Sequence, residues 1–150
     1  MRLLDFPTNI DAYRTVRIES IKEDTPSVKV FTFKDELCNR AKAGQYIMLW
    51  IQGVDEIPLS LSVINCKGRS SISVKNVGEA TEALHGRTTG GFINIRGPYG
   101  NSFNVFEGNV LVVGGGIGVA PLLPLLDSLV KIRSTEVNFV FSSSMHLPPS

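Results

Sequence analysis

Five consecutive residues near the end of the sequence, four of them glycine, give the clearest signal for ligand chemistry. Gly114-x-Gly116-x-Gly118 follows an apolar run at residues 110–113 and precedes a stretch of helical length at residues 119–132. Glycines let backbone N–H groups approach a pyrophosphate, and the start of a helix adds partial positive charge. Val119 stands where the usual dinucleotide fingerprint has glycine or alanine. The loop predicts a dinucleotide site, and the alternative is a tight strand-to-helix turn that binds nothing.

A second candidate is the segment 55–62, which we interpret as a turn that enters a strand. Pro58 fixes the backbone, and Ser60 and Ser62 point to one face if the strand is regular. The Ser60 hydroxyl would then be available to a flavin ring or a phosphate. The alternative is an ordinary edge strand that begins at a proline.

Two further glycine turns lie between these motifs. Residues 74–81 predict a strand, a turn at Gly78 and the start of a short helix, where Thr81 either donates its hydroxyl to a second pyrophosphate or simply caps the helix. Residues 96–100, Arg-Gly-Pro-Tyr-Gly, predict a turn that ends a strand and holds an aromatic side chain near a domain junction, or a purely structural turn. The order of the four motifs is more specific than any one of them.

The sequence offers no convincing acid–base pair, so we name no catalytic residue. His85 is expected to end a surface helix and His146 to lie in a loose tail; residues 141–146 contain serines but no acidic residue for a ribose. This pattern suits hydride and electron transfer, in which a cofactor carries the chemistry. We interpret Cys38 and Cys66 as small buried thiols, because two cysteines cannot form a four-thiolate metal site.

These motifs need elements to position them, and residues 1–105 predict short strands separated by turns. Residues 13–20 alternate so that Val16 and Ile18 share one face, and Phe31 and Phe33 do the same in the next strand. We expect a small antiparallel β-barrel or sandwich. Its strand candidates are residues 13–20, 28–33, 45–51, 61–65, 71–75 and 92–96, with a short helix at residues 79–85.

From residue 106 to residue 150 the pattern changes to that of one βαβ unit. The apolar run at residues 110–113 predicts a strand buried on both faces of a parallel sheet. A helix at residues 119–132, with Pro121 in its first turn, and a second strand at residues 136–141 follow. We therefore expect a first domain at residues 1–105 and the beginning of a doubly wound domain at residues 106–150.

Composition limits the classes of partner. The chain has 150 residues, 43% of them hydrophobic and 19% charged, which fits a globular protein. Fifteen basic and fourteen acidic residues leave a net charge of +1, which gives no support to binding of nucleic acid or an anionic membrane. No apolar run approaches the roughly 20 residues that span a bilayer. We expect a cytoplasmic protein.

The four motifs together resemble the ferredoxin-reductase superfamily, and within it the electron-transfer subunits of dihydroorotate dehydrogenase. The likeness lies in Ile57-Pro-Leu-Ser-Leu-Ser, Gly78-Glu-Ala-Thr-Glu-Ala-Leu-His and Val110-Leu-Val-Val-Gly-Gly-Gly-Ile-Gly-Val-Ala-Pro. It implies an FAD-binding β-barrel joined to an NAD-binding α/β domain, with hydride exchange between FAD and NADH in the cleft between them. It also implies a [2Fe-2S] cluster that relays electrons to the flavin of a separate catalytic subunit in pyrimidine synthesis.

Carried over position by position, the resemblance assigns cofactor contacts to three regions of the barrel and to the glycine loop. Pro58, Leu59 and Ser60 match residues that line the flavin. Ser73, Val74 and Lys75 match the strand after its ribityl and phosphate region, and Ala80 and Thr81 match the pyrophosphate turn. Gly114, Gly115, Gly116 and Gly118 match the loop that faces the nicotinamide dinucleotide.

The sequence departs from the family pattern in two ways. Ile57 stands where many members have an arginine that neutralises the FAD phosphate, and Arg69, Lys75 or Arg87 is a candidate replacement. The family's later stretch, with the rest of the NAD-binding sheet and four clustered cysteines, has no counterpart in the 150 residues. We therefore expect weak NAD binding and a need for a partner, because an unfinished sheet edge tends to pair or aggregate.

Three functions remain open from the sequence. The chain is an electron-transfer flavoprotein that serves a dihydroorotate dehydrogenase catalytic subunit; or it is a truncated module that binds FAD or a partner without turnover. A third alternative is a stand-alone reductase that passes electrons from NAD(P)H to a small acceptor.

Overall fold

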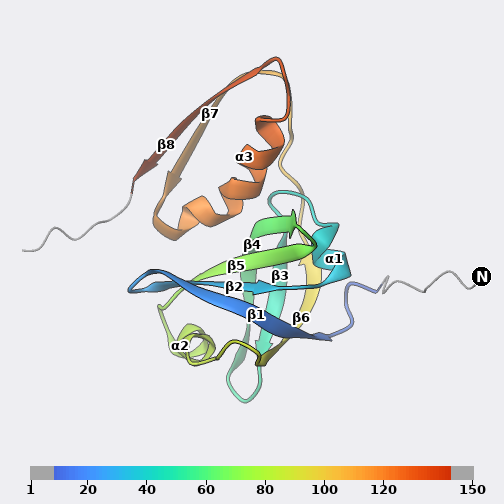
Figure 1. The fold of residues 1–150 in the computed structure, drawn as a ribbon, viewed down its shortest axis with the longest axis vertical. Helices are drawn as coiled ribbons and strands as arrows, with labels where there is room; N and C mark the ends of the chain where they lie inside the picture. The colour runs from blue at the N-terminus through green and yellow to red at the C-terminus, as the bar shows by residue number, and fades with distance from the viewer. Residues whose placement is uncertain (1–8, 143–150) are drawn as a thin grey trace, which may run out of the picture.

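The computed structural model describes residues 9–142, and six of its strands close into an antiparallel barrel (Figure 1). Around the barrel the strand order is β1-β2-β5-β4-β3-β6. The strands are β1 (Arg14–Thr25), β2 (Val28–Phe33), β3 (Tyr46–Ile51), β4 (Asp55–Cys66), β5 (Arg69–Lys75) and β6 (Phe92–Tyr99). The barrel predicted from the sequence is confirmed.

Alternating apolar residues explain why these segments form a barrel. Val16 and Ile18 share one face of β1 and Phe31 and Phe33 share one face of β2, as predicted, and both faces point into one core in which the two phenylalanines are fully buried. Side chains of successive strand residues point to opposite faces, so each strand contributes every second residue to that core. The helix α1 (Glu36–Asn39) adds the buried Cys38 to the same core.

Strand β4 changes partner half-way along its length. Residues Asp55 to Ser60 pair with β3, whereas Leu61 to Cys66 pair with β5. The prediction of a turn followed by a strand at residue 61 was wrong, because Pro58 lies inside β4, opposite Met48. Proline has no backbone N–H to donate to a sheet. Pro58 is tolerated here because, on the side away from β3, no strand pairs with this half of β4.

The helix α2 (Glu79–His85) covers the end of the barrel where β4 and β5 are not paired (Figure 1). Its bounds agree with the helix predicted from the sequence. Leu84 is fully buried in the barrel core, and Ala80 and Ala83 pack against that core. The helix therefore acts as a plug for this end of the barrel.

After the barrel, the chain forms a parallel two-stranded sheet and a helical segment. β7 (Gly108–Gly115) and β8 (Thr135–Ser142) pair in parallel, as the βαβ pattern predicted. The predicted helix at residues 119–132 is instead a 3₁₀ helix, η1 (Gly116–Leu122), followed by a short α-helix, α3 (Leu123–Leu129). Pro121 lies inside η1 and Pro124 in the first turn of α3, and a proline cannot donate the backbone bond that a continuous α-helix needs.

One face of the β7–β8 sheet is open to solvent. α3 packs on one side of the sheet, where Val112 forms a core cluster with Leu125 and Leu129 (Figure 1). Leu111 and Val113 on the other side are 64% and 65% exposed. The prediction of a strand buried on both faces was therefore wrong for the described residues, in which only one layer covers this sheet.

The barrel meets the helical layer at Ala43, which belongs to the same cluster as Val112. Phe103, in the segment between β6 and β7, lies against Gly44, and its backbone N–H donates to the carbonyl oxygen of Ala43.

No helix within residues 9–142 has both the length and the apolar character needed to cross a bilayer. The division into domains at residues 105 and 106 stays a prediction.

Candidate functional site

The glycine loop separates into a packing position and two open positions. A Cβ atom on Gly114 would lie 3.0 Å from side-chain atoms of both Leu122 and Val119. Gly114 is thus required for η1 to pack closely against the end of β7. Gly116 has a positive φ of 53°, and around Gly116 and Gly118 nothing lies within 4 Å of an added Cβ. Gly116 and Gly118 present an open backbone to a ligand, and Gly115 is also exposed but lies near the Ser142 hydroxyl.

The segment of β4 that the resemblance assigns to the flavin presents residues on both of its faces. Ile57 and Leu59 pack toward the barrel core, whereas Pro58 is exposed. Ser60 is half-buried and lies opposite Tyr46 of β3. Pro58, Leu59 and Ser60 therefore do not share one face, and a single flat ring cannot contact all three side chains from one side.

Ser62 does not continue the regular alternation expected from Ser60. Leu61 and Ser62 are both buried, and the register of β4 against β5 shifts between Leu61 and Val63. The Ser62 hydroxyl donates to the Ser71 carbonyl oxygen at 3.2 Å. Its expected position on the Ser60 face was wrong because this irregularity turns it into the barrel wall.

At the start of α2, the Thr81 hydroxyl acts as a helix cap. Its oxygen accepts hydrogen bonds from the backbone N–H groups of Val77 (2.9 Å) and Gly78 (3.0 Å), and it donates to the Gly78 carbonyl oxygen at 3.0 Å. The capping alternative thus describes the hydroxyl in this structure. These hydrogen bonds order the backbone of the turn beside Ala80. The resemblance assigns Ala80, like Thr81, to the cofactor.

A hollow of about 300 Å³ lies where β4 approaches α2. It contains two of the assigned residues, Ala80 and Thr81, and also Ile57, the position of the family arginine. Its full lining is Val54, Asp55, Ile57, Val77, Gly78, Glu79, Ala80 and Thr81. The strand switch of β4 creates this space, because β5 does not pair with the part of β4 that forms one wall.

The last residues of β5 divide between core and solvent. Val74 is buried, Ser73 is half-buried and Lys75 is exposed. The Val74 carbonyl oxygen accepts from Nε2 of His85 at 2.8 Å. His85 was expected simply to end a surface helix, but its half-buried ring ties α2 to β5 and lies 6.3 Å from the Phe31 ring.

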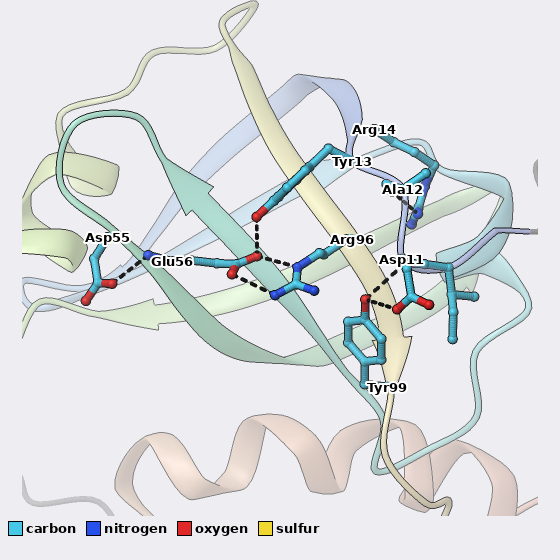
Figure 2. Close-up of polar contacts among 9 residues, drawn as sticks. Asp11, Ala12, Tyr13, Arg14, Asp55, Glu56, Arg96 and Tyr99 are labelled. Carbon is cyan, nitrogen blue, oxygen red and sulfur yellow. Dashed lines mark hydrogen bonds and ion pairs between the residues drawn. The ribbon is translucent and has the colours of Figure 1, made fainter.

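A polar network on the outer surface of the barrel joins residues to which the sequence assigned no role. Nε and Nη2 of Arg96 donate to the two carboxylate oxygens of Glu56 at 2.5 and 2.8 Å, and the Tyr13 hydroxyl donates to the same carboxylate at 2.8 Å (Figure 2). The bonds from Arg96 and Tyr13 hold the pKa of Glu56 below its ordinary value, and the bond to Glu56 raises the pKa of Tyr13. β6 runs between Tyr13 and Glu56, and Tyr13 reaches across it (Figure 2).

Tyr99 extends this network toward the start of the described chain. Its hydroxyl donates to Asp11 Oδ1 at 2.9 Å, and the Arg96 guanidinium lies 5.8 Å from its ring centre and 5.6 Å from that of Tyr13 (Figure 2). Burial and the bond to Asp11 raise the pKa of Tyr99. The expected turn at residues 96–100 was wrong, because β6 continues through Tyr99 with a cis peptide bond before Pro98.

A buried ion pair anchors the start of β1. Arg14 donates to both carboxylate oxygens of Asp35, at 2.8 and 3.0 Å, and to the Gly97 carbonyl oxygen at 2.8 Å. Burial by itself would raise the pKa of Asp35, but the bonds from Arg14 and the Cys38 N–H outweigh it and lower this pKa. The pair fixes β6 at the position where the chain leaves the barrel.

Comparison with known proteins gives sequence relatives and similar folds, although no family model matches the chain. The chain is 44% identical over 121 residues to a probable dihydroorotate dehydrogenase B (NAD(+)) electron transfer subunit of Methanocella arvoryzae. It is 41% identical over 113 residues to the protein of the same name from Methanothermobacter thermautotrophicus. These matches cover 81% and 75% of this chain. The chain is homologous to these electron transfer subunits. It spans 44% and 42% of the length of the two relatives.

Solved structures agree with this homology. The structure of an NADH-dependent reduced ferredoxin-NADP oxidoreductase superposes with a TM-score of 0.80 at 26% identity, covering 86% of this chain and 48% of the other. Phthalate dioxygenase reductase superposes with a TM-score of 0.76 at 18% identity, covering 91% of this chain and 46% of the other. The resemblance to electron-transfer subunits and the ferredoxin-reductase-like fold predicted from the sequence are both confirmed.

In this homologue of the electron transfer subunits, the candidate substitutes for the missing arginine differ in their surroundings. Arg69 forms an ion pair with Glu19 at the opposite end of β5 from Lys75. Lys75 is exposed and precedes the turn into α2, and Arg87 follows the end of that helix. Lys75 lies two residues before Val77, which lines the hollow, and within residues 9–142 neither Lys75 nor Arg87 forms an ion pair of the kind that Arg69 makes.

The two cysteines of this homologue differ in environment. Cys38 is fully buried, and burial raises the pKa of its thiol, whereas Cys66 is exposed at the end of β4. The prediction of two buried thiols was thus wrong for Cys66.

Residues 9–142 contain no group of three or more His, Cys, Asp or Glu side chains that could hold a metal ion. Residues 143–146, which include His146, lie outside the described residues.

Proposed function

We propose that the chain belongs to a flavoprotein that transfers electrons between NAD(H) and a dihydroorotate dehydrogenase catalytic subunit in pyrimidine biosynthesis. The observation that carries this proposal is the 44% identity over 121 residues to a protein of that name, on a matching barrel fold. The catalytic subunit is the expected partner in a hetero-oligomer. The cytoplasmic location expected from the sequence stays a prediction.

FAD is the cofactor that we assign to the barrel. Its isoalloxazine ring accepts a hydride and returns electrons singly or in pairs. The hollow between β4 and α2 fits part of such a ligand, since it is lined by Ile57 of β4 and by Ala80 and Thr81 of an ordered turn. In this proposal, Leu59 packs in the barrel core behind the strand, the Ser60 hydroxyl hydrogen-bonds the ring, and Lys75 supplies positive charge toward the diphosphate. Pro58, Ser73 and Val74 hold the strands in place.

NAD(H) is proposed to approach the barrel from the β7 side. The open backbone at Gly116 and Gly118 suits a pyrophosphate, whereas Gly114 and Gly115 shape the turn. A dinucleotide held by Gly116 and Gly118 would lie where η1 faces β4 and β5 of the barrel, and it would supply the hydride that FAD accepts. A [2Fe-2S] cluster does not fit the described residues, because such a cluster needs four ligands and they provide two cysteines in different environments.

The test has three readouts on the purified chain. We expect bound flavin by visible absorbance, bleaching of that absorbance by NADH without oxygen, and copurification with a coexpressed dihydroorotate dehydrogenase catalytic subunit. Ser60→Ala is expected to reduce flavin binding, and Ser20→Ala, at an exposed position of β1, is the matched control.

Each alternative function gives a different result. A colourless protein that no added FAD colours would reject the proposal and leave an interaction module. Flavin that NADH does not bleach would indicate binding without turnover. Rapid reduction of small acceptors without any binding to the catalytic subunit would favour a stand-alone reductase.

A further inference from the structure

A pocket of about 320 Å³ lies between the barrel and α3. Asp127 and Ser128 of α3 line one part of it, and residues 41–43 and Ile64 of the barrel line another. The pocket shares no lining residue with the hollow at α2, and it contains none of the residues to which the resemblance assigned a cofactor contact. Its volume is at the lower end of the range of small-molecule sites, so it admits a small organic molecule.

The barrel side of this pocket is ordered by close packing and by hydrogen bonds. The Phe103 ring lies against Gly44, where a Cβ atom would approach the ring to 3.0 Å and where φ is 99°. The Phe103 N–H donates to the Ala43 carbonyl oxygen at 2.9 Å, and Oε1 of Gln45 accepts the Lys42 backbone N–H at 2.9 Å. Because this wall is ordered before binding, a ligand loses less conformational entropy there.

Apolar side chains form part of the same lining. Phe103 and Val105, in the segment between β6 and β7, are 39% and 42% exposed although both line a pocket. Pro124 of α3 is buried, and Ile64 of β4 is half-buried. These surfaces suit the apolar body of a ligand better than they suit water.

The charged groups of the pocket have an excess of one positive charge. Lys42 and Lys131 contribute ammonium groups and Asp127 contributes a carboxylate. Within residues 9–142 none of these three side chains forms an ion pair. Two lysines without a carboxylate partner favour an anionic group, because bonds between ions of opposite charge are stronger than neutral hydrogen bonds.

We propose that the pocket beside α3 binds a small organic carboxylate with an apolar body. Lys42 and Lys131 contact the carboxylate group, and Phe103 and Val105 contact the apolar body. Asp127 repels negative charge and so disfavours ligands with more than one. Since Lys42 belongs to the barrel and Lys131 follows α3, the ligand holds these two parts together. The site goes beyond the proposed function and needs neither flavin nor nicotinamide.

The first experiment uses three probes on the 150-residue chain. Benzoate, its neutral counterpart benzamide and inorganic phosphate would be titrated while the methyl signals of Ala41 and Val105 are followed by NMR. We expect saturable shifts of both residues with benzoate, binding at least about fivefold weaker with benzamide, and no shift of Val105 with phosphate. Absence of saturable shifts with benzoate, or equal binding of either other probe, would overturn the proposal.

The second experiment uses the sign of a charge effect. Lys42→Gln and Lys131→Gln should each weaken benzoate binding about fivefold, as expected for one charge pair near the surface. Asp127→Asn should strengthen it, because a repulsive charge is removed. Lys22→Gln is the matched control, since Lys22 is exposed on β1 and outside the pocket. Urea midpoints close to that of the wild type would show that the variants fold. Weaker binding by Asp127→Asn, or an equal loss in Lys22→Gln, would overturn the proposal.

The third experiment tests whether the site is separate from any flavin site. Benzoate titrations would be repeated with a saturating amount of FAD, and the dissociation constant should be unchanged. Competition between FAD and benzoate would overturn the assignment to the pocket beside α3. If the chain binds no FAD, the proposed function fails, and the inference is still decided by the benzoate titrations of the wild type and the lysine variants.

Discussion

Arg96 and Glu56 form a two-bond ion pair although a whole strand separates them. Arg96 lies on β6 and Glu56 on β4, and β3 runs between these strands. In the register, Met48 of β3 lies opposite Arg96, and Trp50 lies opposite Glu56. The two side chains therefore reach toward each other diagonally over β3, and the pair ties three strands into one rigid surface.

Loss of the Glu56 charge should weaken this surface at neutral pH. We expect Glu56→Gln to lower the urea midpoint of unfolding at pH 7, because Arg96 and Tyr13 would lose their charged acceptor. The folded-state pKa of Glu56 is depressed, so the pair stabilises the fold above the ordinary glutamate pKa of about 4.3 and loses its effect as the pH falls below it. The difference between wild type and variant should thus vanish in acid. Glu107→Gln is the exposed control, and a difference that persists unchanged to low pH would contradict the assignment.

The buried pair of Arg14 and Asp35 should contribute more to stability. We expect Asp35→Asn to cost about 2 kcal/mol in the free energy of unfolding, less than for a fully buried pair because the Arg14 side chain keeps 12% exposure. The pKa of Asp35 is lowered, so this contribution is present above the ordinary aspartate pKa of about 3.9 and declines as the pH falls further. Urea titrations at several pH values measure it. Asp24→Asn, at an exposed site of β1, should change little, and equal losses in the two variants would refute the prediction.

The glycine loop should respond differently at its two ends. Gly114→Ala would bring a methyl group to 3.0 Å from Leu122 and Val119, and we expect a loss of about 2 kcal/mol from overpacking. Gly118→Ala meets open space and should leave the melting temperature unchanged while it weakens NADH binding. Thermal unfolding and NADH titration separate the two effects. If Gly118→Ala left NADH binding intact, the loop would be a purely structural turn.

The two cysteines should differ in reactivity. Cys66 is exposed and Cys38 is buried with a raised thiol pKa, so a thiol reagent such as Ellman's reagent should modify one cysteine in the folded chain and both after denaturation. Cys66→Ser should abolish the rapid reaction. Rapid modification of two thiols in the native chain would show that α1 opens readily.

The parts of the fold that the sequence predicted are those that local alternation determines. Phe31 and Phe33 were placed on one face of a strand because they alternate along it, and that face is buried; α2 was placed correctly because good helix formers follow a glycine. Thr81 was given both a ligand role and a capping role from the same local pattern. The observed hydrogen bonds are those of the cap.

The remaining features depend on how distant segments meet. Glu56 and Arg96 are 40 residues apart, and no local pattern indicates that they pair across a third strand. The apolar run at residues 110–113 carries no information on how many layers cover it, so the exposure of Leu111 could not be predicted. Likewise, the carboxylates around the hollow come from two segments that only the switch of β4 brings together.

The change of partner along β4 also makes the thermal stability of the barrel depend on whether a ligand is bound. The first half of β4 has a backbone ladder only with β3, and on its other side, where β5 does not pair with it, α2 packs against the barrel. A molecule that contacts both β4 and α2 would hold these two elements together. A ligand that binds the folded state and not the unfolded state raises the unfolding temperature as its concentration increases. The melting curve of a preparation would then report its cofactor occupancy, with the empty fraction melting first.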